Sequence, residues 1–158
     1  PTKGALMYQV SDQSVAADEV FRKVAYAAPY LELVEELTLE EIIKFHFQFK
    51  QMRESLSHEE LADKMLLGHA LKKPVQDFSS GMKQRLKLGL AFFSKAALLL
   101  LDEPTSNLDA QGIAWYRDHV LPLLDTTCVV IGSNQTYEYD FCTEQLLITD
   151  WKKKKSFF

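Results

Sequence analysis

Two adjacent carboxylates at the end of an apolar run are the residues best placed for chemistry. The run Leu98–Leu101 leads directly into Asp102 and Glu103. Neighbouring residues at a strand end point in different directions, so one carboxylate can serve a metal ion while the other faces a reacting water. Enzymes that transfer phosphoryl groups use such an Asp to support Mg²⁺, which neutralises charge on the phosphates. The same pair is also compatible with a solvated acidic strand end that binds nothing.

A turn of small residues, Ser79-Ser80-Gly81, stands ahead of this strand and opens a helix. A helix N-terminus presents unpaired N–H groups and the positive end of its dipole, which suits an anion such as a terminal phosphate. Small residues let that backbone approach a ligand closely, and either serine can add a hydroxyl donor. The alternative is that Ser79 or Ser80 only caps the helix.

The pattern of apolar residues predicts an α/β fold that carries both motifs. The run Ala96–Leu101 is continuous enough for a strand buried on both faces of a parallel sheet. Ligands bind beyond the carboxyl ends of such strands, where Asp102 and Glu103 lie. The expected strands are Ala5–Val10, Val24–Ala28, Ala96–Leu101, Cys128–Gly132 and Glu144–Thr149, and the expected helices after residue 77 are Met82–Ser94, Ala110–Leu124 and a short one at Tyr137–Cys142.

A mainly helical segment is expected between the strand near residue 28 and the serine turn. Thr38 with Glu41, and Ser57 with Glu60, each have the spacing of a capping box that opens a helix. Gly68 is the expected end of the second helix. We divide the chain into a core segment 1–36, a helical subdomain 37–76, a second core segment 77–150 and a basic tail 151–158.

Composition and charge limit the classes of function. The chain has 158 residues, and 18 Lys and Arg against 22 Asp and Glu give a net charge of −4. This mild acidity gives no general reason to bind nucleic acid or an anionic membrane. No apolar run approaches the roughly 20 residues that cross a bilayer. The cysteines, Cys128 and Cys142, fit a reducing compartment, and Cys128 is expected in the core.

The motifs together resemble the ATP-binding cassette (ABC) ATPase family. Phe78–Arg85 (FSSGMKQR) resembles the family's signature motif, Leu98–Glu103 (LLLLDE) its Walker B motif and Ser106–Asp109 (SNLD) its D-loop. Pro29–Glu41 is similar to the stretch that joins core and helical subdomain in bacterial transporter ATPases. The resemblance implies a P-loop NTPase (RecA-like) fold, with an ABC ATPase core and an inserted α-helical subdomain. It also implies ATP and Mg²⁺ as cofactors.

The resemblance further implies roles for individual residues. Asp102 would hold Mg²⁺ through its water shell, and Glu103 would be the general base that polarises the attacking water. The residues of the signature turn would contact the γ-phosphate of ATP bound to a second ATPase subunit in a head-to-tail dimer. Residues 106–109 would cross that dimer interface. The positions implied as nucleotide-binding are Ser79, Ser80, Gly81, Met82, Asp102, Ser106 and Asp109.

The sequence also departs from the family pattern. No GxxxxGK[ST] phosphate-binding loop occurs, and in the family it would precede Pro1, so we expect the N-terminal part of the core to be missing. Pro29 and Tyr30 stand where a glutamine contacts Mg²⁺ and the attacking water. Asn134 replaces the switch histidine; it can donate a hydrogen bond to the γ-phosphate but cannot titrate. In the signature, Ser80 and Met82 replace a Gly and a Gln.

Three functions follow as hypotheses. The leading one is the ATPase subunit of an ABC transporter, cytoplasmic and peripheral on the inner face of the cell membrane through a separate permease, without nucleic acid. Some of Phe45, Phe47 and Phe49 would then form the groove for a permease helix. The second is a binding or regulatory module with little or no hydrolysis, because the glutamine and histidine are absent. The third is a soluble ABC ATPase that works on nucleic acid or ribosomes.

Overall fold

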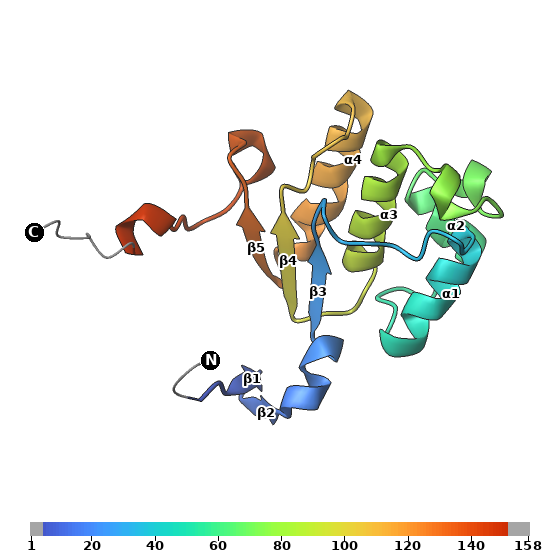
Figure 1. The fold of residues 1–158 in the computed structure, drawn as a ribbon. Coiled ribbons are helices and arrows are strands. Elements are labelled where there is room, and N and C mark those ends of the chain that lie inside the picture. The colour runs from blue at the N-terminus through green and yellow to red at the C-terminus, as the bar shows by residue number, and fades with distance from the viewer. Residues whose placement is uncertain (1–4, 152–158) are drawn as a thin grey trace, which may run out of the picture.

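The computed structural model describes residues 5–151, and the rest of the basic tail expected at 151–158 lies outside them. Its centre is a three-stranded parallel sheet in the order β3-β4-β5 (Figure 1), made of β3 (Val24–Ala27), β4 (Leu98–Asp102) and β5 (Cys128–Gly132). Ala27 pairs with Leu101, and Asp102 pairs with Gly132. Because the strands are parallel, all three carboxyl ends meet at one edge. These three predicted strands are confirmed.

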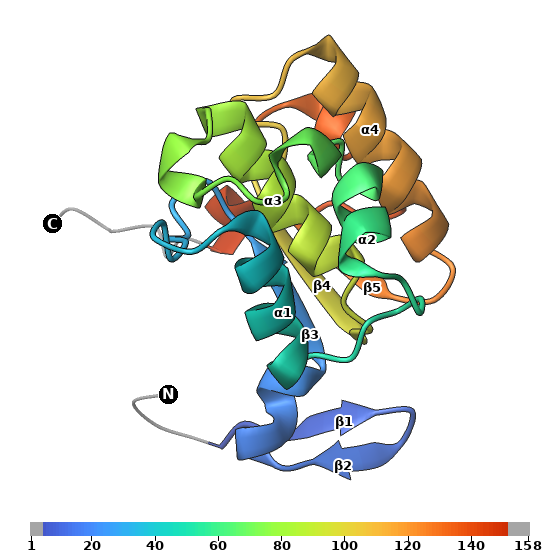
Figure 2. The ribbon, with the colours of Figure 1, turned by 90° about the vertical axis from the view of Figure 1, so that its right-hand side faces the viewer.

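Two helices, α3 (Ser80–Phe92) and α4 (Ala110–Val120), cover one face of this sheet (Figures 1 and 2). Side chains alternate along a strand, and in β4 only Leu99 and Leu101 are fully buried. Leu98 and Leu100 are half-buried on the opposite face. The prediction that this strand is buried on both faces is therefore wrong: its apolar run serves one packed face and one open face.

The helical segment contains α1 (Leu39–Phe49) and α2 (His58–Lys64), both confirmed together with their capping boxes. The Glu41 amide donates to Thr38 Oγ1 at 3.3 Å, while Glu41 Oε2 accepts from the Thr38 amide at 2.8 Å. The predicted helix end at Gly68 is wrong, because α2 stops at Lys64. Leu66 adopts φ 59°, the left-handed conformation that usually falls to glycine, so the chain turns earlier.

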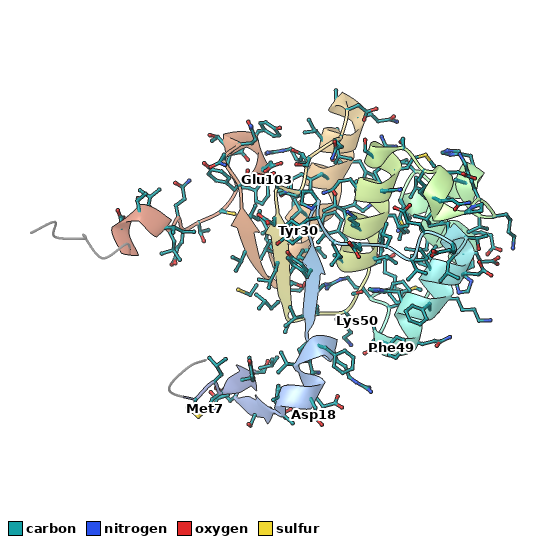
Figure 3. All side chains as sticks on the ribbon, in the orientation of Figure 1. Met7, Asp18, Tyr30, Phe49, Lys50 and Glu103 are labelled. Carbon is teal, nitrogen blue, oxygen red and sulfur yellow. The ribbon has the colours of Figure 1, made fainter. Side chains whose placement is uncertain are left out.

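Lys50 ties the end of α1 to the start of the sheet, near Phe49 (Figure 3). Its ammonium group donates hydrogen bonds to the carbonyls of Phe21 and Val24. Removal from water lowers the pKa of Lys50. Lys50 thus fastens the helical segment to the start of β3.

The N-terminal strand prediction, Ala5–Val10, is only partly right. A short antiparallel hairpin forms from β1 (Tyr8–Val10) and β2 (Gln13–Val15), away from the main sheet (Figure 1). Ser11 and Asp12 turn the chain with φ 48° and 63°. Two positive φ angles are what a type I′ hairpin turn requires. Because Ser-Asp lacks the glycine usual there, the sequence gives little signal of this hairpin.

The C-terminal predictions fail more clearly. No strand forms at Glu144–Thr149 in the described part of the chain; a 3₁₀ turn occupies Ile148–Trp151, and Leu147 and Ile148 are 64% and 77% exposed. In place of the helix expected at Tyr137–Cys142 there is a 3₁₀ turn, Thr136–Glu138, which includes only the first two residues of that range. Cys128 is exposed rather than part of the core.

Among the described residues the outer edge of β5 stays unpaired, and the apolar stretch that follows β5 does not add a strand to it. The expected helix Ala110–Leu124 ends at Val120 and continues as a 3₁₀ turn, because Pro122 cannot donate to the helical ladder. Within residues 5–151, no helix is both long and apolar enough to cross a membrane.

A histidine lies between α1 and the end of α3. His46 Nε2 is 2.9 Å from Ser94 Oγ, and that hydroxyl donates to the Leu90 carbonyl at 2.6 Å, so Nε2 is the donor in the first bond. Burial, and then the charge of Lys50, lower the pKa of His46 from 6.5 to about 4. The fold therefore holds His46 neutral.

This depressed pKa predicts acid sensitivity. Above pH 6.5 the neutral histidine costs nothing, and between pH 6.5 and 4 the unfolded chain gains a proton that the folded chain does not. We expect stability to fall over this window by at most about 3 kcal/mol from this group. Urea unfolding between pH 7.5 and 4 measures it, with His46→Gln as the comparison, in which the slope should flatten. Parallel curves for the two proteins would contradict the assignment.

Candidate functional site

Asp102 and the glycine beside it define the strand-end edge of the site. The half-buried Asp102 is the last residue of β4 and pairs with Gly132. A Cβ at Gly132 would lie 3.2 Å from Asp102 Oδ1. Gly132 thus leaves space for the carboxylate at the edge where ligands bind in open α/β sheets.

The chain turns sharply at Glu103, immediately after this strand. Glu103 has φ 40°, which is unusual for a residue other than glycine. Its amide donates to the Gly132 carbonyl at 2.8 Å, and its carboxylate Oε2 lies 3.4 Å from the Ser106 hydroxyl. Such backbone conformations persist only where the surroundings enforce them, and they are frequent in functional sites.

Three of the predicted site residues surround one cavity of about 210 Å³ at this edge. They are Glu103, Ser106 and Asn134. The fold therefore brings a carboxylate and a hydroxyl from the turn after β4 together with an amide from the loop after β5. The complete lining is Glu103, Thr105, Ser106, Ser133, Asn134, Gln135, Tyr137 and Glu138.

The turn Ser79-Ser80-Gly81, called the signature turn below, borders a second cavity of about 350 Å³. Ser79 caps α3, its hydroxyl accepting from the Met82 amide at 3.2 Å. A Cβ at Gly81 would lie 2.9 Å from the Asn107 carbonyl oxygen, so this helix start is packed tightly against the chain after β4. The lining residues are Ser79, Ser80, Gly81, Met82, Arg85, Asn107, Leu108 and Asp109.

Asp109 lines this cavity and contacts both α3 and α4, the two helices that cover the sheet. Its Oδ1 accepts from the Gly112 amide at 2.8 Å, which caps α4, and from Arg85 Nη2 of α3 at 3.0 Å. The amide of Gly112, and then the charge of Arg85, lower the pKa of Asp109. Arg85 Nε is buried without a hydrogen-bond partner among the described residues.

The predicted residues therefore fall into separate groups. The cavity at Glu103 and the cavity at the signature turn have no lining residue in common, and Asp102 lines neither. One loop, residues 103–109, supplies residues to both cavities. Within this chain, the structure does not bring the signature turn to Glu103.

Tyr30 lies beside Asp102 where the family resemblance places a glutamine. Figure 3 shows Tyr30 and Glu103 at the same end of the sheet. The hydroxyls of Tyr30 and Tyr26 share a hydrogen bond. That bond, then burial, then Asp102 raise the pKa of Tyr30 to about 12. The phenol stays protonated at neutral pH and is available as a donor beside the carboxylate.

The two carboxylates at this strand end, Asp102 and Glu103, suit Mg²⁺ in the way that enzymes acting on nucleotides bind the ion. Among residues 5–151, no group of three or more His, Cys, Asp and Glu side chains is arranged to hold a metal ion. Mg²⁺ needs no such cage, because it keeps several waters and takes one or two carboxylates together with substrate phosphates. Asp102, with Glu103 next to it, offers that kind of contact.

Two buried residues that the sequence reasoning missed hold the loop after β4. Gln84 and Glu138 are each 2% exposed. Gln84 Nε2 donates to the Pro104 carbonyl at 2.8 Å, and Glu138 Oε1 accepts from the Thr105 amide at 2.8 Å. Gln84 lies one turn before the buried Leu88, so helix phase could have revealed it. Glu138 follows no apolar pattern, and nothing in the sequence marked it.

Comparison with known proteins gives the family. The family model described as "ABC transporter" matches residues 1–106, well over half of the chain. The chain belongs to the ABC transporter family.

The chain spans only part of the length of the curated relatives that it matches. An uncharacterized ABC transporter ATP-binding protein of Bacillus subtilis, YcbN, is 34% identical over 117 residues, which are 74% of this chain and 38% of YcbN. Elongation factor 3 of Mycosarcoma maydis is 33% identical over 82 residues, 52% of this chain and 8% of that protein.

A solved ABC structure shows the fold. It is a dimeric ATP-binding cassette in a post-hydrolysis state with ADP and Pi, and it superposes with a TM-score of 0.68 at 19% identity. The match covers 84% of this chain and 64% of that one. The mixed α/β architecture with a parallel sheet is thus the P-loop NTPase core of ABC ATPases, as predicted.

The two bonds of Asp109 predict a graded loss of stability. In Asp109→Ala, α4 loses its cap, and we expect the free energy of unfolding to fall by about 1 kcal/mol. Asp109→Asn keeps the capping oxygen and loses only the charge facing Arg85, so the fall should be smaller. Urea unfolding measures both. Equal losses in the two variants would show that the ion pair, rather than the cap, matters.

Proposed function

We propose that the natural protein containing these residues is the ATP-hydrolysing subunit of an ABC transporter, which couples MgATP hydrolysis to transport through a separate permease. One observation carries the proposal: Glu103, Ser106 and Asn134 line one cavity, and this cavity lies at the edge of the sheet where β4 ends with Asp102. A base, hydrogen-bond donors and a metal-binding carboxylate are what hydrolysis of a phosphoanhydride requires.

In the proposed mechanism Glu103 is the general base. It accepts a proton from a water while the water oxygen bonds to the γ-phosphorus, and the bond from that phosphorus to the ADP oxygen breaks. Asn134 donates a hydrogen bond to the γ-phosphate, as an amide can do without titrating. Asp102 would hold Mg²⁺ through its water shell; when bound, the ion neutralises charge on the phosphates.

The signature turn is proposed to act in trans, as a dimer of two ATPase subunits would require. Ser79, Ser80, Gly81 and Met82 would contact the γ-phosphate of ATP held by the second subunit. Two features support this arrangement: the turn opens the 13-residue helix α3, and its cavity is separate from the one at Glu103. Ser106–Asp109 would then cross the interface. The solved relative with ADP and Pi is itself a dimer.

The permease is proposed to dock beside α1. A cavity of about 360 Å³ lies between β3 and α1, and its lining includes Leu31, Val34 and Phe45. Phe45 and Phe49, both 51% exposed, contact each other edge to face at 5.3 Å between ring centroids. An apolar groove with aromatic edges suits a helix from a partner. We also propose that residues 37–76 form a helical subdomain between core segments 1–36 and 77–150, and that this subdomain lies at the cytoplasmic face of the membrane.

The second candidate function is a soluble ABC ATPase that works on nucleic acid or ribosomes, and one observation favours it. A protein named elongation factor 3 is also similar to about half of the chain. The net charge of −4 argues against a nucleic-acid-binding role. Tight, salt-dependent RNA binding by the natural protein would favour this candidate over the transporter.

The general base gives the decisive prediction. In the natural protein, we expect Glu103→Gln to lower MgATP turnover by about 100-fold or more, because the amide cannot accept the proton. Glu36→Gln, at an exposed carboxylate outside both cavities, should keep the wild-type rate. Released phosphate is the measurement.

Two further outcomes bear on the same proposal. The 158 residues alone should show no turnover, since they contain no GxxxxGK[ST] loop to hold the phosphates. If Glu103→Gln and wild type turn over ATP at the same rate, the hydrolytic role is wrong and a regulatory ATP-binding module is the better reading.

A further inference from the structure

Glu138 is a buried carboxylate that the proposed mechanism does not use. It is 2% exposed, and its Oε1 accepts hydrogen bonds from both the amide and the hydroxyl of Thr105. The amide bond is 2.8 Å long. Thr105 is itself 6% exposed, so both partners are removed from water. A carboxylate that accepts two donors in such surroundings makes strong, well-oriented bonds.

The second oxygen of Glu138 contrasts with the first. Oε2 is buried without a hydrogen bond among the described residues. Buried polar atoms are nearly always paired, and an unpaired one in a native structure calls for an explanation. A residue needed only to fill space would avoid this cost, so the bonds made by Oε1 have a value beyond packing.

The backbone around Glu138 is anchored on α4. The Tyr116 hydroxyl donates to the Glu138 carbonyl at 2.7 Å, and Tyr116 is fully buried. Arg117 donates to the Tyr137 carbonyl at 2.7 Å and pairs with Asp140 at the same distance. Glu138 is therefore a rigid point from which a neighbouring loop can be held.

The loop held by Glu138 is the one that carries Glu103. Thr105 lies two residues after Glu103, whose φ of 40° must be enforced by its surroundings. The other attachments are the Gly132 carbonyl at the Glu103 amide and Gln84 at the Pro104 carbonyl. Glu138 supplies the bond on the side of the Asn134 loop, and it lines the same cavity as Glu103 and Asn134.

We propose that Glu138 is a positioning residue for catalysis: through Thr105 it holds the turn after β4, so that the Glu103 carboxylate faces the reacting water beside Asn134. This inference rests on the proposed function. Because Glu138 is proposed to act through Thr105 rather than on the nucleotide itself, its loss should affect the chemical step and leave ATP binding nearly unchanged.

Three variants of the natural protein test this role. Glu138→Ala removes the acceptor, and we expect kcat to fall about 10- to 100-fold, because small displacements of a catalytic group are costly. KM for ATP should stay within about twofold. Glu138→Gln keeps an oxygen for the Thr105 amide and should restore most of kcat. Thr105→Val removes only the hydroxyl and should give an intermediate kcat, which serves if Glu138→Ala does not fold.

A matched control separates positioning from general stability. Thr38→Ala removes the capping box of α1, far along the chain from this loop, and should lower the melting temperature without changing kcat. Amide hydrogen exchange gives a readout independent of turnover. At Thr105 it should speed up about tenfold or more in Glu138→Ala, and stay at the wild-type rate in Thr38→Ala.

The outcomes distinguish this inference from the proposed function. Wild-type turnover that Glu103→Gln abolishes, but Glu138→Ala leaves intact, overturns the positioning role alone. A joint rise in KM and fall in melting temperature, with no rescue by Glu138→Gln, also overturns it. Absence of turnover in the wild-type protein overturns the proposed function, and the exchange at Thr105 then still decides whether Glu138 holds the loop.

Discussion

The bend of the chain after β4 is the constraint on which the candidate site depends. Strand geometry carries Asp102 to the sheet edge, and the next residue must leave the strand with a positive φ. A glycine would make this turn without strain but could supply no carboxylate. Keeping Glu103 there requires outside attachments, and the sheet, α3 and the segment after β5 each contribute one.

These attachments explain why polar residues lie inside the covering layer. Gln84 occupies a buried position on α3 that an aliphatic side chain would fill more simply. It is tolerated because its amide nitrogen satisfies the Pro104 carbonyl, which would otherwise lack a donor. Glu138 does the same for the Thr105 amide. The interior near the sheet edge is thus organised by the backbone of one loop.

Sequence patterns predicted the parts of the fold that have a strong local cause. The capping boxes at Thr38 and Ser57, and the strands β3, β4 and β5, depend on neighbouring residues or on long apolar runs. The errors arise where tertiary context decides. Leu66 ends a helix by adopting a conformation that its residue type disfavours. Residues 144–149 are apolar enough for a strand, but in the described part of the chain they leave the outer edge of β5 unpaired.

The residues of the candidate site also divide into those that the sequence marks and those that only the fold reveals. Asp102, Glu103 and the signature turn could be chosen from sequence because adjacent carboxylates and a small-residue helix start have recognisable spacing. Glu138 could not, because its importance comes only from the residues that the fold brings beside it, and the sequence marked Tyr30 only as a departure from the family's glutamine. Tyr30 gains its meaning from Tyr26 and Asp102.

The loop 103–109 connects two cavities that share no residue, and this has a mechanical consequence. Glu103 at its start faces one cavity, while Asp109 at its end is bound to Arg85 beside the other. The contact between Gly81 and the Asn107 carbonyl is too close for a Cβ, so the start of α3 cannot move toward the loop without displacing it. A ligand that shifts the signature turn therefore acts on the same short segment whose other end carries the proposed base. In a head-to-tail dimer, phosphate bound at the signature turn could in this way change the position of Glu103 in the same chain. The loop 103–109 would transmit the change, and the sheet itself would not need to move.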